Sequence, residues 1–354
     1  MHQALKTPAS INRQMASSAI SSQAQGSGTS AQAFIKAHLE TELPRRFGHP
    51  VKIVEMRWEE IERQTSFSAQ ILTLQMDHGG PLKLFVKDYS SSSLPKEGLA
   101  QRSTREHRVY RDLLSQVTLD TPHYYGAVQI PDSNGFYLLI EFVEGIWLDY
   151  RGFDDWTRAA AWLGQLHGAF TNHQNELASA DYLDTHDAAF FRTKAENALK
   201  SVVEFSPAQA SRLAPVLEGY DEIVNIMTAQ PRTLVHGSFR LRNVLVTPTD
   251  TPVRICPVDW ELAARGGGLY DLAFVADGFN PEKVNTLLDA YLDQFSKHAI
   301  AWTSREKMTS AIHCFRLHKI MKSLSDSVSL KFSREAVDEY VDMAIAVRQT
   351  IDDE

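Results

Sequence analysis

Two short polar segments, each beside an apolar run, constrain this chain more than any other feature of its sequence. The first, residues 233–246, reads TLVHGSFRLRNVLV, and the second, residues 253–261, reads VRICPVDWE. The pattern predicts a loop, a strand, a turn and a second strand that gather His236, Asn243 and Asp259 beside one buried ribbon. Amide and carboxylate oxygens are hard ligands, and Mg²⁺ is held by one or two such groups together with phosphate oxygens and water. We therefore expect Asn243 and Asp259 to be metal ligands.

The arrangement resembles the catalytic and metal-binding loops of the aminoglycoside phosphotransferase and choline kinase family, which is related to protein kinases. In that family one loop reads His-Gly-Asp, four residues, Asn, and the other reads Asp-Trp-Glu before a Gly-rich turn and Asp-Leu-Ala. His236-Gly237-Ser238 and Asn243 keep the first spacing, and residues 259–273 keep the second. The resemblance implies a two-lobed α+β fold of the protein-kinase type, with ATP and Mg²⁺ as cofactors.

Ser238 stands where the family has its catalytic aspartate. Serine cannot act as a general base at neutral pH without an activating partner, although it can position a group by hydrogen bonding. Loss of a general base costs about 10²–10⁴-fold in rate. Arg240 lies where protein kinases carry a lysine directed at the transferred phosphate, so its guanidinium could stabilise the transition state. The alternative is that Arg240 is a solvated or locally paired charge.

Three neighbours of these loops also have expected roles. We place His236 in the catalytic loop as a structural hydrogen-bonding residue, and we expect Asp271 to hold that loop through backbone N–H groups. Glu261 either supplies a substitute carboxylate near the metal or packs and pairs locally.

Composition narrows the functional classes. With 354 residues and 43% hydrophobic content, the chain can bury a large core and is expected to form two lobes. A formal net charge of −8 argues against a nucleic-acid partner and favours a cationic small-molecule acceptor. The sequence contains no run of 18 apolar residues, so it predicts no membrane-spanning helix. The chain has two cysteines, Cys256 and Cys314, without CxxC spacing, which argues against a disulfide framework or a structural zinc site.

The N-terminal segment, residues 1–30, is rich in Ser, Ala and Gln and is predicted to be a disordered tail. Its lack of acidic residues is also typical of an organellar transit peptide, but such peptides are Arg-rich and this segment is not. We expect a cytoplasmic protein with a nucleotide-binding lobe at 31–143. A helical lobe at 144–354 would carry the catalytic and metal loops.

The expected N-terminal lobe is a helix at 31–47 followed by a five-stranded sheet. Its predicted strands are 51–58, 66–76, 82–89, 123–129 and 136–143. Lys87 ends the third strand, and Glu106 lies on a predicted helix at 98–114. The resemblance implies that these two residues pair and hold the α and β phosphates of the nucleotide. The alternative is that both are solvated surface charges.

Two further nucleotide contacts are expected on weaker signals. Residues 63–69 lie where the fold places its phosphate-covering loop, yet they contain no glycine, so an ordinary hairpin is an equal alternative. No P-loop pattern occurs anywhere in the chain. The resemblance places the hinge between the lobes at Glu141 to Val143, where adenine would meet backbone groups.

The C-terminal half is predicted to be helical. Asp154 or Asp155 can cap one helix, Ser206 and Asn280 each precede a proline at the first position of a helix, and 303–306 is a capping box. These signals divide the C-terminal half into helices that are expected at 185–203, 207–229, 281–297, 304–323 and 334–350.

Three functions fit these residues. The first is an ATP- and Mg²⁺-dependent kinase that phosphorylates a hydroxyl of a small molecule, docked between Ser238 and residues 279–318. The second is a pseudokinase, which is a nucleotide-binding or interaction module without turnover. The third is another nucleotide-dependent transfer, such as that of AMP, on the same frame.

Overall fold

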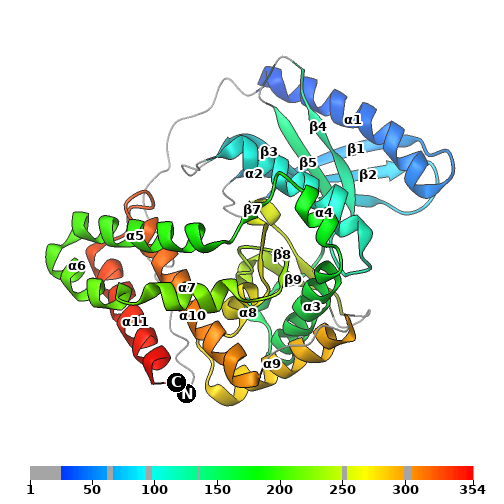
Figure 1. Ribbon diagram of the computed structural model, residues 1–354. Coiled ribbons are helices and arrows are strands. Elements are labelled where there is room, and N and C mark those ends of the chain that lie inside the picture. The colour runs from blue at the N-terminus through cyan, green and yellow to red at the C-terminus, as the bar shows by residue number, and fades with distance from the viewer. Residues whose placement is uncertain are drawn as a thin grey trace. The chain divides into compact units, whose positions relative to one another are not determined.

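The computed structural model describes residues 25–61, 67–92, 98–131, 133, 135–248, 253–298 and 304–353. These residues form two compact units. The first runs from the N-terminal helix to Gly145 and also includes Thr247–Glu261. The second, the helical unit, contains Ile146–Val246 and the chain from Leu262 onward. The described residues therefore have the predicted α+β class, with an antiparallel sheet first and helices afterwards (Figure 1).

The first unit, which we call the sheet unit, contains the predicted five-stranded antiparallel sheet, in the order β1-β2-β3-β5-β4. The strands are β1 (Ile53–Glu60), β2 (Phe67–Met76), β3 (Leu82–Ser92), β4 (Tyr124–Gln129) and β5 (Phe136–Glu141). Side chains alternate between the two faces of a strand. Leu84 and Val86 of β3 lie in the core beside the N-terminal helix. Lys87 and Tyr89 lie on the other face of the same strand.

Helix α1 (Gln25–Phe47) closes the first face of the sheet through Ile35, Leu39 and Leu43, which recur every four residues and are fully buried. The helix begins at Gln25, within the segment 1–30 for which the sequence predicts a tail. Residues 1–24 lie outside the described chain.

Helix α2 (Leu99–Arg108) brings Glu106 towards the other face of the sheet. It continues as a π-helical turn (Val109–Leu113) and a short 3-10 turn (Leu114–Gln116). The predicted helix at 98–114 is therefore present, with a change of helix type after Arg108.

One boundary differs from the predicted division into lobes. Residues 247–261, including Asp259, group with the sheet unit rather than with the helical unit. The physical reason is a set of ionic contacts that tie this segment to the sheet and to α2. These contacts are Arg254 to Glu141, Asp259 to Lys87, and Glu261 to Arg102.

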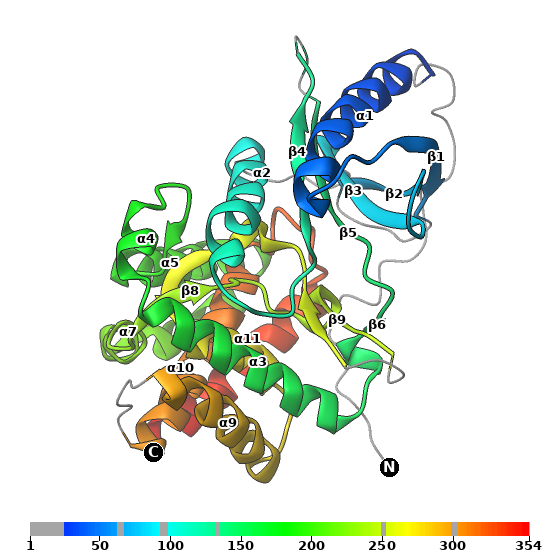
Figure 2. The same cartoon turned by 90° about the vertical axis from the view of Figure 1, so that its right-hand side faces the viewer.

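The helical unit is built from α3 (Phe153–Thr171), α4 (Gln174–Ser179), α5 (Ala188–Phe205), α6 (Pro207–Leu213), α7 (Tyr220–Thr228), α8 (Leu269–Val275), α9 (Pro281–Phe295), α10 (Arg305–Ser325) and α11 (Arg334–Asp352). Short strands lie among these helices (Figure 2). Strand β6 (Ile146–Trp147) pairs with β9 (Val244–Val246), and β11 (Ala264–Gly267) lies between β7 (Asp184–Thr185) and β8 (Arg232–Val235). Strand β10 (Ile255–Pro257) belongs to the sheet unit.

Local capping chemistry explains several helix starts. Ser206 and Asn280 accept hydrogen bonds from the backbone N–H groups of Gln209 and Lys283, as predicted. Ser304 caps α10, while Thr303 of the predicted capping box lies outside the described residues. The prediction that Asp154 or Asp155 caps α3 is wrong.

Helix α3 begins one residue before Asp154, after Gly152. The Asp155 carboxylate instead pairs with Arg151 and Arg158, which lie within one helical turn of it. The predicted helix at 207–229 is also interrupted. The chain adopts a positive φ of 67° at Gly219, which separates α6 from α7.

His318 is a fully buried ring in the core of the helical unit. It packs edge-on against Phe191, with ring centroids 4.6 Å apart. Neither ring nitrogen has a hydrogen-bond partner among the described residues. Burial, together with the nearby His186, Lys322 and Lys194, therefore holds the pKa of His318 well below its usual value.

We expect acid to destabilise the helical unit through His318. Because its pKa is lower in the folded than in the unfolded state, the unfolded chain takes up the proton first as the pH falls below about 6.5. From pH 7.5 to 5.5 this group should remove about 1.4 kcal/mol from the free energy of unfolding. Urea unfolding at both pH values should show a smaller acid loss for His318→Phe than for the wild type. Equal losses would contradict the assignment.

Candidate functional site

Lys87 is the centre of a buried ionic cluster in the sheet unit. Its ammonium donates to the Glu106 carboxylate at 2.7 Å and to the Asp259 carboxylate at 2.6 Å. Tyr89 also donates its hydroxyl to Glu106. Lys87 is 7% exposed and Glu106 is 1% exposed. The structure therefore brings together Lys87, Glu106 and Asp259, which lie up to 172 positions apart in sequence.

The cluster perturbs the protonation of its members. Burial alone would lower the pKa of Lys87, but the Asp259 and Glu106 carboxylates outweigh it and raise that pKa above its usual value. Burial raises the pKa of Glu106 to about 7, against the attraction of Lys87. Lys87 is thus a fixed cation, and such a buried cation is kept only where negative partners surround it.

Asp259 adopts a left-handed backbone conformation, with φ of 69°. Such a conformation in a residue other than glycine is strained and persists only when its surroundings enforce it. The flanking side chains do so, because Trp260 is fully buried and Glu261 is held from α2. The strain places a partly exposed carboxylate, 34% of whose side-chain surface is accessible, next to Lys87.

Glu261 is held locally, which is the second of its two expected roles. Arg102 pairs with the Glu261 carboxylate at 3.1 Å, and Arg105 donates to the Glu261 carbonyl oxygen at 2.7 Å. Only 6% of the Glu261 side chain is exposed. Its carboxylate therefore serves to anchor the residues after Asp259.

The segment proposed as the hinge contains one residue with open backbone groups. The Glu141 N–H donates to the His123 carbonyl, and its side chain pairs with Arg254 at 2.6 Å. Burial would raise the pKa of Glu141, but hydrogen bonds from Arg254 outweigh it and lower that pKa. Val143 is buried, and within the described ranges its N–H and C=O make no hydrogen bond. Val143, rather than Glu141, has the groups that could meet adenine.

In the helical unit, Asp271 holds the loop that follows β8. Its carboxylate accepts from the backbone N–H of His236 at 2.6 Å and from that of Gly237 at 3.1 Å. These bonds confirm the expectation that Asp271 fixes the loop. Gly237 is required there, since its φ is 77° and a Cβ would lie 1.9 Å from the Leu262 carbonyl oxygen.

Asp271→Asn is expected to loosen this loop and destabilise the helical unit. The carboxylate is completely buried, and the amide loses the charge that strengthens both hydrogen bonds. We expect the free energy of unfolding to fall by about 1.5–3 kcal/mol, measured by urea unfolding. Asp289→Asn, which removes the charge of an exposed carboxylate in α9, is the matched control. A loss no larger than that of the control would refute the role of Asp271.

Ser238 lies at the tip of the loop and is 7% exposed. Its backbone N–H donates to His236 Nδ1 at 3.3 Å, and its carbonyl oxygen accepts from the side chain of Asn243 at 3.0 Å. Across the part of the chain that the structure describes, its hydroxyl has no hydrogen-bond partner. No activating base is therefore in place for this serine.

Asn243 and Arg240 complete the loop. Because the Asn243 side-chain NH₂ group is bound to Ser238, the amide oxygen faces away from that bond and can accept or ligate. Arg240 is exposed, and Arg242 pairs with Asp149 at 2.9 Å.

The donor atoms fit the magnesium that the fold family implies. Asp259 of the sheet unit has a carboxylate and Asn243 of the helical unit has an amide oxygen, and each is by itself a ligand type that Mg²⁺ takes from proteins. In the described ranges no group of three or more His, Cys, Asp or Glu residues could hold a metal ion.

The sequence pattern of the APH phosphotransferase enzyme family matches residues 63–307. The chain belongs to this family. A search of curated protein sequences found no match.

Solved structures of several phosphotransferases have the same fold. A mutant of aminoglycoside 2'-phosphotransferase-IIIa with GDP has a TM-score of 0.57 and 14% identity, covering 89% of this chain and 98% of that one. Choline kinase from Cryptosporidium parvum Iowa II has a TM-score of 0.57 and 14% identity, covering 84% and 90%. Macrolide 2'-phosphotransferase MphH from Brachybacterium faecium has a TM-score of 0.53 and 15% identity, covering 84% and 96%. At these identities the likeness establishes the fold.

Sequence reasoning missed three residues of this phosphotransferase site. Tyr89 bonds to Glu106, and Arg102 and Arg105 hold Glu261. Tyr89 lies two residues after Lys87, on the same face of β3, and Arg102 lies one helical turn before Glu106. These spacings could have revealed both neighbours of the Lys87 cluster. Residues 63–66 of the expected phosphate-covering loop at 63–69 lie outside the described chain.

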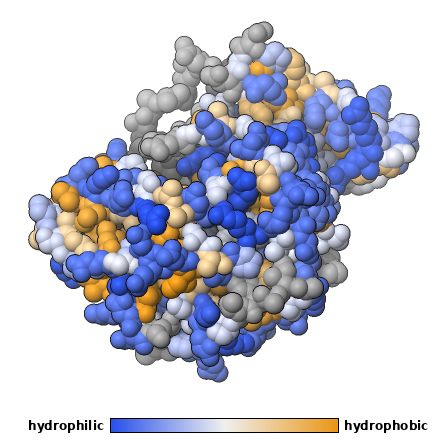
Figure 3. Space-filling view, viewed as in Figure 1, coloured by the Kyte–Doolittle hydropathy of each residue, from blue (hydrophilic) through white to orange (hydrophobic). Residues whose placement is uncertain are grey.

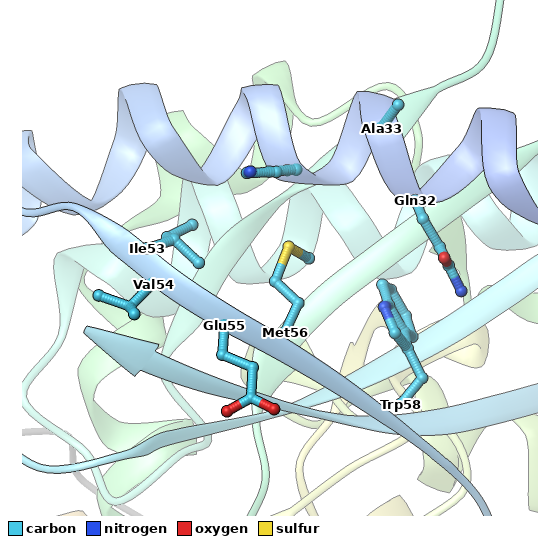
Figure 4. A pocket seen from close by; sticks show the side chains of 8 residues that line it. Gln32, Ala33, Ile53, Val54, Glu55, Met56 and Trp58 are labelled. Carbon is cyan, nitrogen blue, oxygen red and sulfur yellow. The ribbon is translucent and has the colours of Figure 1, made fainter. Parts of the chain in front are cut away.

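Two other surfaces are separate from the motif residues. A pocket of about 290 Å³ lies between α1 and β1 of the sheet unit and is lined by residues such as Ala33, Met56 and Trp58 (Figure 4). Hydrophobic surface also covers the end of the helical unit formed by α5, α6 and α11, where Val203 and Met343 are exposed (Figure 3). None of the helices in the described ranges has the length and apolar character that a membrane span requires.

Proposed function

We propose that this family member is an ATP- and Mg²⁺-dependent phosphotransferase that phosphorylates a hydroxyl of a small molecule through an altered catalytic loop. The observation that carries the proposal is the buried cluster of Lys87, Glu106 and the strained Asp259. A buried cation and a strained carboxylate both lower the stability of the fold. The cation could bind phosphate oxygens, and the carboxylate could bind a metal ion that is coordinated by the same phosphates. The relatives above are phosphotransferases for aminoglycosides, choline and macrolides, which supports a small-molecule acceptor.

Each residue has a proposed task. Val143 offers its open backbone groups to adenine, and Lys87, held by Glu106, binds the α and β phosphates. Asp259 and Asn243 would each offer one oxygen ligand to Mg²⁺, and the metal would supply positive charge against the phosphates. Arg240 stabilises charge on the transferred group.

Ser238 positions the acceptor hydroxyl by a hydrogen bond, while Asp271 and His236 keep the loop in shape. The acceptor oxygen forms a bond to the γ-phosphorus, the bond from that phosphorus to the β-phosphate oxygen breaks, and ADP leaves. The hydroxyl proton departs late to water, because this transition state is loose and makes little demand on a base.

A pseudokinase is the second candidate, and one observation favours it. Over the described residues the Ser238 hydroxyl has no partner that could activate it. Transfer of AMP on the same frame is a third candidate. Label from the γ-phosphate on an acceptor supports the kinase, label from the α-phosphate supports AMP transfer, and binding without either supports the pseudokinase.

Binding of Mg-ATP is expected to raise thermal stability. A ligand that binds only the folded state stabilises it by about 2.7 kcal/mol at 100 times its dissociation constant. Asp259→Ala should remove the Mg²⁺-dependent part of this shift. Glu144→Ala, which deletes an exposed carboxylate in the same unit, should leave it unchanged. No shift with millimolar Mg-ATP in the wild type would refute nucleotide binding.

The composition of the chain is indirect evidence about the charge of the acceptor. The net charge of −8 favours a cationic acceptor, but it is an average over the whole surface. Charges local to Ser238 are a more direct guide.

A further inference from the structure

Two cations of α10 share one carboxylate at the end of α8. Arg316 and Lys319 are one turn apart, and both point to Asp277, with nitrogen-to-oxygen distances of 3.3 and 3.4 Å. Helices α8 and α10 pack against each other, and this contact lies at the surface of that packing, since 42% of the Asp277 side chain is exposed. Neither side chain is used by the proposed mechanism.

Lys319 is the more buried of the two. Its side chain is 15% exposed, and its ammonium lies 4.0 Å from the centre of the Phe274 ring. Its other polar contact is the Ala273 carbonyl oxygen at 3.2 Å. Burial lowers the pKa of Lys319 to about 8, with the neighbouring Arg316 and Arg240 contributing and Asp277 only partly opposing them.

Arg240 connects this pair to the catalytic loop. It follows Ser238 by two residues in the loop that Asp271 of α8 holds, and Lys319 binds the same helix at the Ala273 carbonyl oxygen. The charge of Arg240 contributes to the lowered pKa of Lys319. Arg240 is exposed, and in the described part of the chain it has no carboxylate partner. We define Arg240, Arg316 and Lys319 as the basic cluster. Arg316 and Lys319 share Asp277 as a counter-ion, in a chain whose net charge is −8.

We propose that the basic cluster binds an anionic group, a carboxylate or a phosphate, on the acceptor, so that the substrate is an acidic hydroxyl compound. Partly buried cations that share one carboxylate gain most from a further anion, and two guanidinium groups can bind carboxylate or phosphate oxygens in pairs. The inference rests on the proposed phosphotransferase function and replaces the cationic acceptor expected from composition. It also fits the predicted docking region at 279–318, because Asp277, Arg316 and Lys319 lie at its two ends.

The first test compares matched acceptors. The wild type, labelled ATP and Mg²⁺ are incubated with a hydroxy acid and its amide, and with a sugar phosphate and its free sugar. We expect label on the anionic member of a pair. Lys319→Gln should raise the acceptor KM by about tenfold or more, equivalent to one lost ionic contact, while the KM for ATP stays unchanged. Arg305→Gln, on the same helix with an exposed partner, is the control. Equal labelling of the uncharged members, or equal changes in both KM values, would overturn the proposal.

The second test needs no turnover. Acetylation of Lys319 by acetic anhydride is followed by mass spectrometry, with and without inorganic phosphate and without nucleotide. Bound phosphate should slow acetylation of Lys319 but not of Lys307, which is exposed on the same helix. Arg240→Gln should weaken this protection. Absence of protection at tens of millimolar phosphate would overturn the anion site, whereas absence of Mg-ATP binding would overturn the proposed function instead.

Discussion

Ser238→Asp is expected to lower phosphotransfer, although it restores the residue that the family carries at this position. A new carboxylate would pair with Arg240, which follows by two residues, or repel the transferred phosphate. Two unit charges about 4 Å apart interact by about 4 kcal/mol at an effective dielectric constant near 20. A loss on the order of 10- to 1000-fold in kcat/KM is therefore expected, measured as transfer of labelled phosphate.

Ser238→Ala separates this effect from simple loss of the serine. The alanine removes one hydrogen bond, worth about 0.5–1.5 kcal/mol, so kcat/KM should fall by about tenfold at most. If the site were instead a kinase that had lost only its base, Ser238→Asp would raise activity by up to about 10²–10⁴-fold. A rise for the aspartate variant together with an inactive wild type would contradict our account.

Lys87→Met is expected to cause the largest loss of stability among single substitutions in the sheet unit. It leaves the Glu106 carboxylate, which is 1% exposed, without its cation. Removing one partner of a buried ion pair costs about 3–5 kcal/mol. The free energy of unfolding should fall by this amount in a urea titration, and binding of Mg-ATP should be lost as well.

The same strand supplies the matched control. Lys83 lies on β3 and pairs with Glu144, but it is 46% exposed, so Lys83→Met should have little effect. The double variant Lys87→Met/Glu106→Gln should recover much of the stability, because replacing both partners removes the unpaired buried charge. Nucleotide binding should not recover. Equal losses for the two lysine variants would contradict a buried role for Lys87.

The parts of the fold that depend on local chemistry could be predicted from the sequence. The strands follow from alternating apolar residues and turn residues, and Ser206 and Asn280 cap helices because a short polar side chain next to a proline favours that geometry. The pairing of Lys87 with Glu106 was predictable only through the resemblance to kinases.

Features set by tertiary contacts were not predictable. Asp155 does not cap α3 as predicted, because Arg151 and Arg158 bind its carboxylate. The partner of Glu261 lies on α2, 159 positions away. The positive φ of Asp259 is likewise imposed by its surroundings and has no signature in the sequence. The charge of the basic cluster was hidden because the net charge of the chain has the opposite sign.

The central claim is that this protein transfers the γ-phosphate of ATP to a small molecule with Mg²⁺. The most direct measurement incubates the purified protein with γ-labelled ATP, Mg²⁺ and a metabolite extract, and then separates the products by charge. Our account predicts label on one or more acidic metabolites, lost when Mg²⁺ is chelated or when Asp259 is replaced by alanine. Binding of Mg-ATP with no label on any metabolite would contradict it.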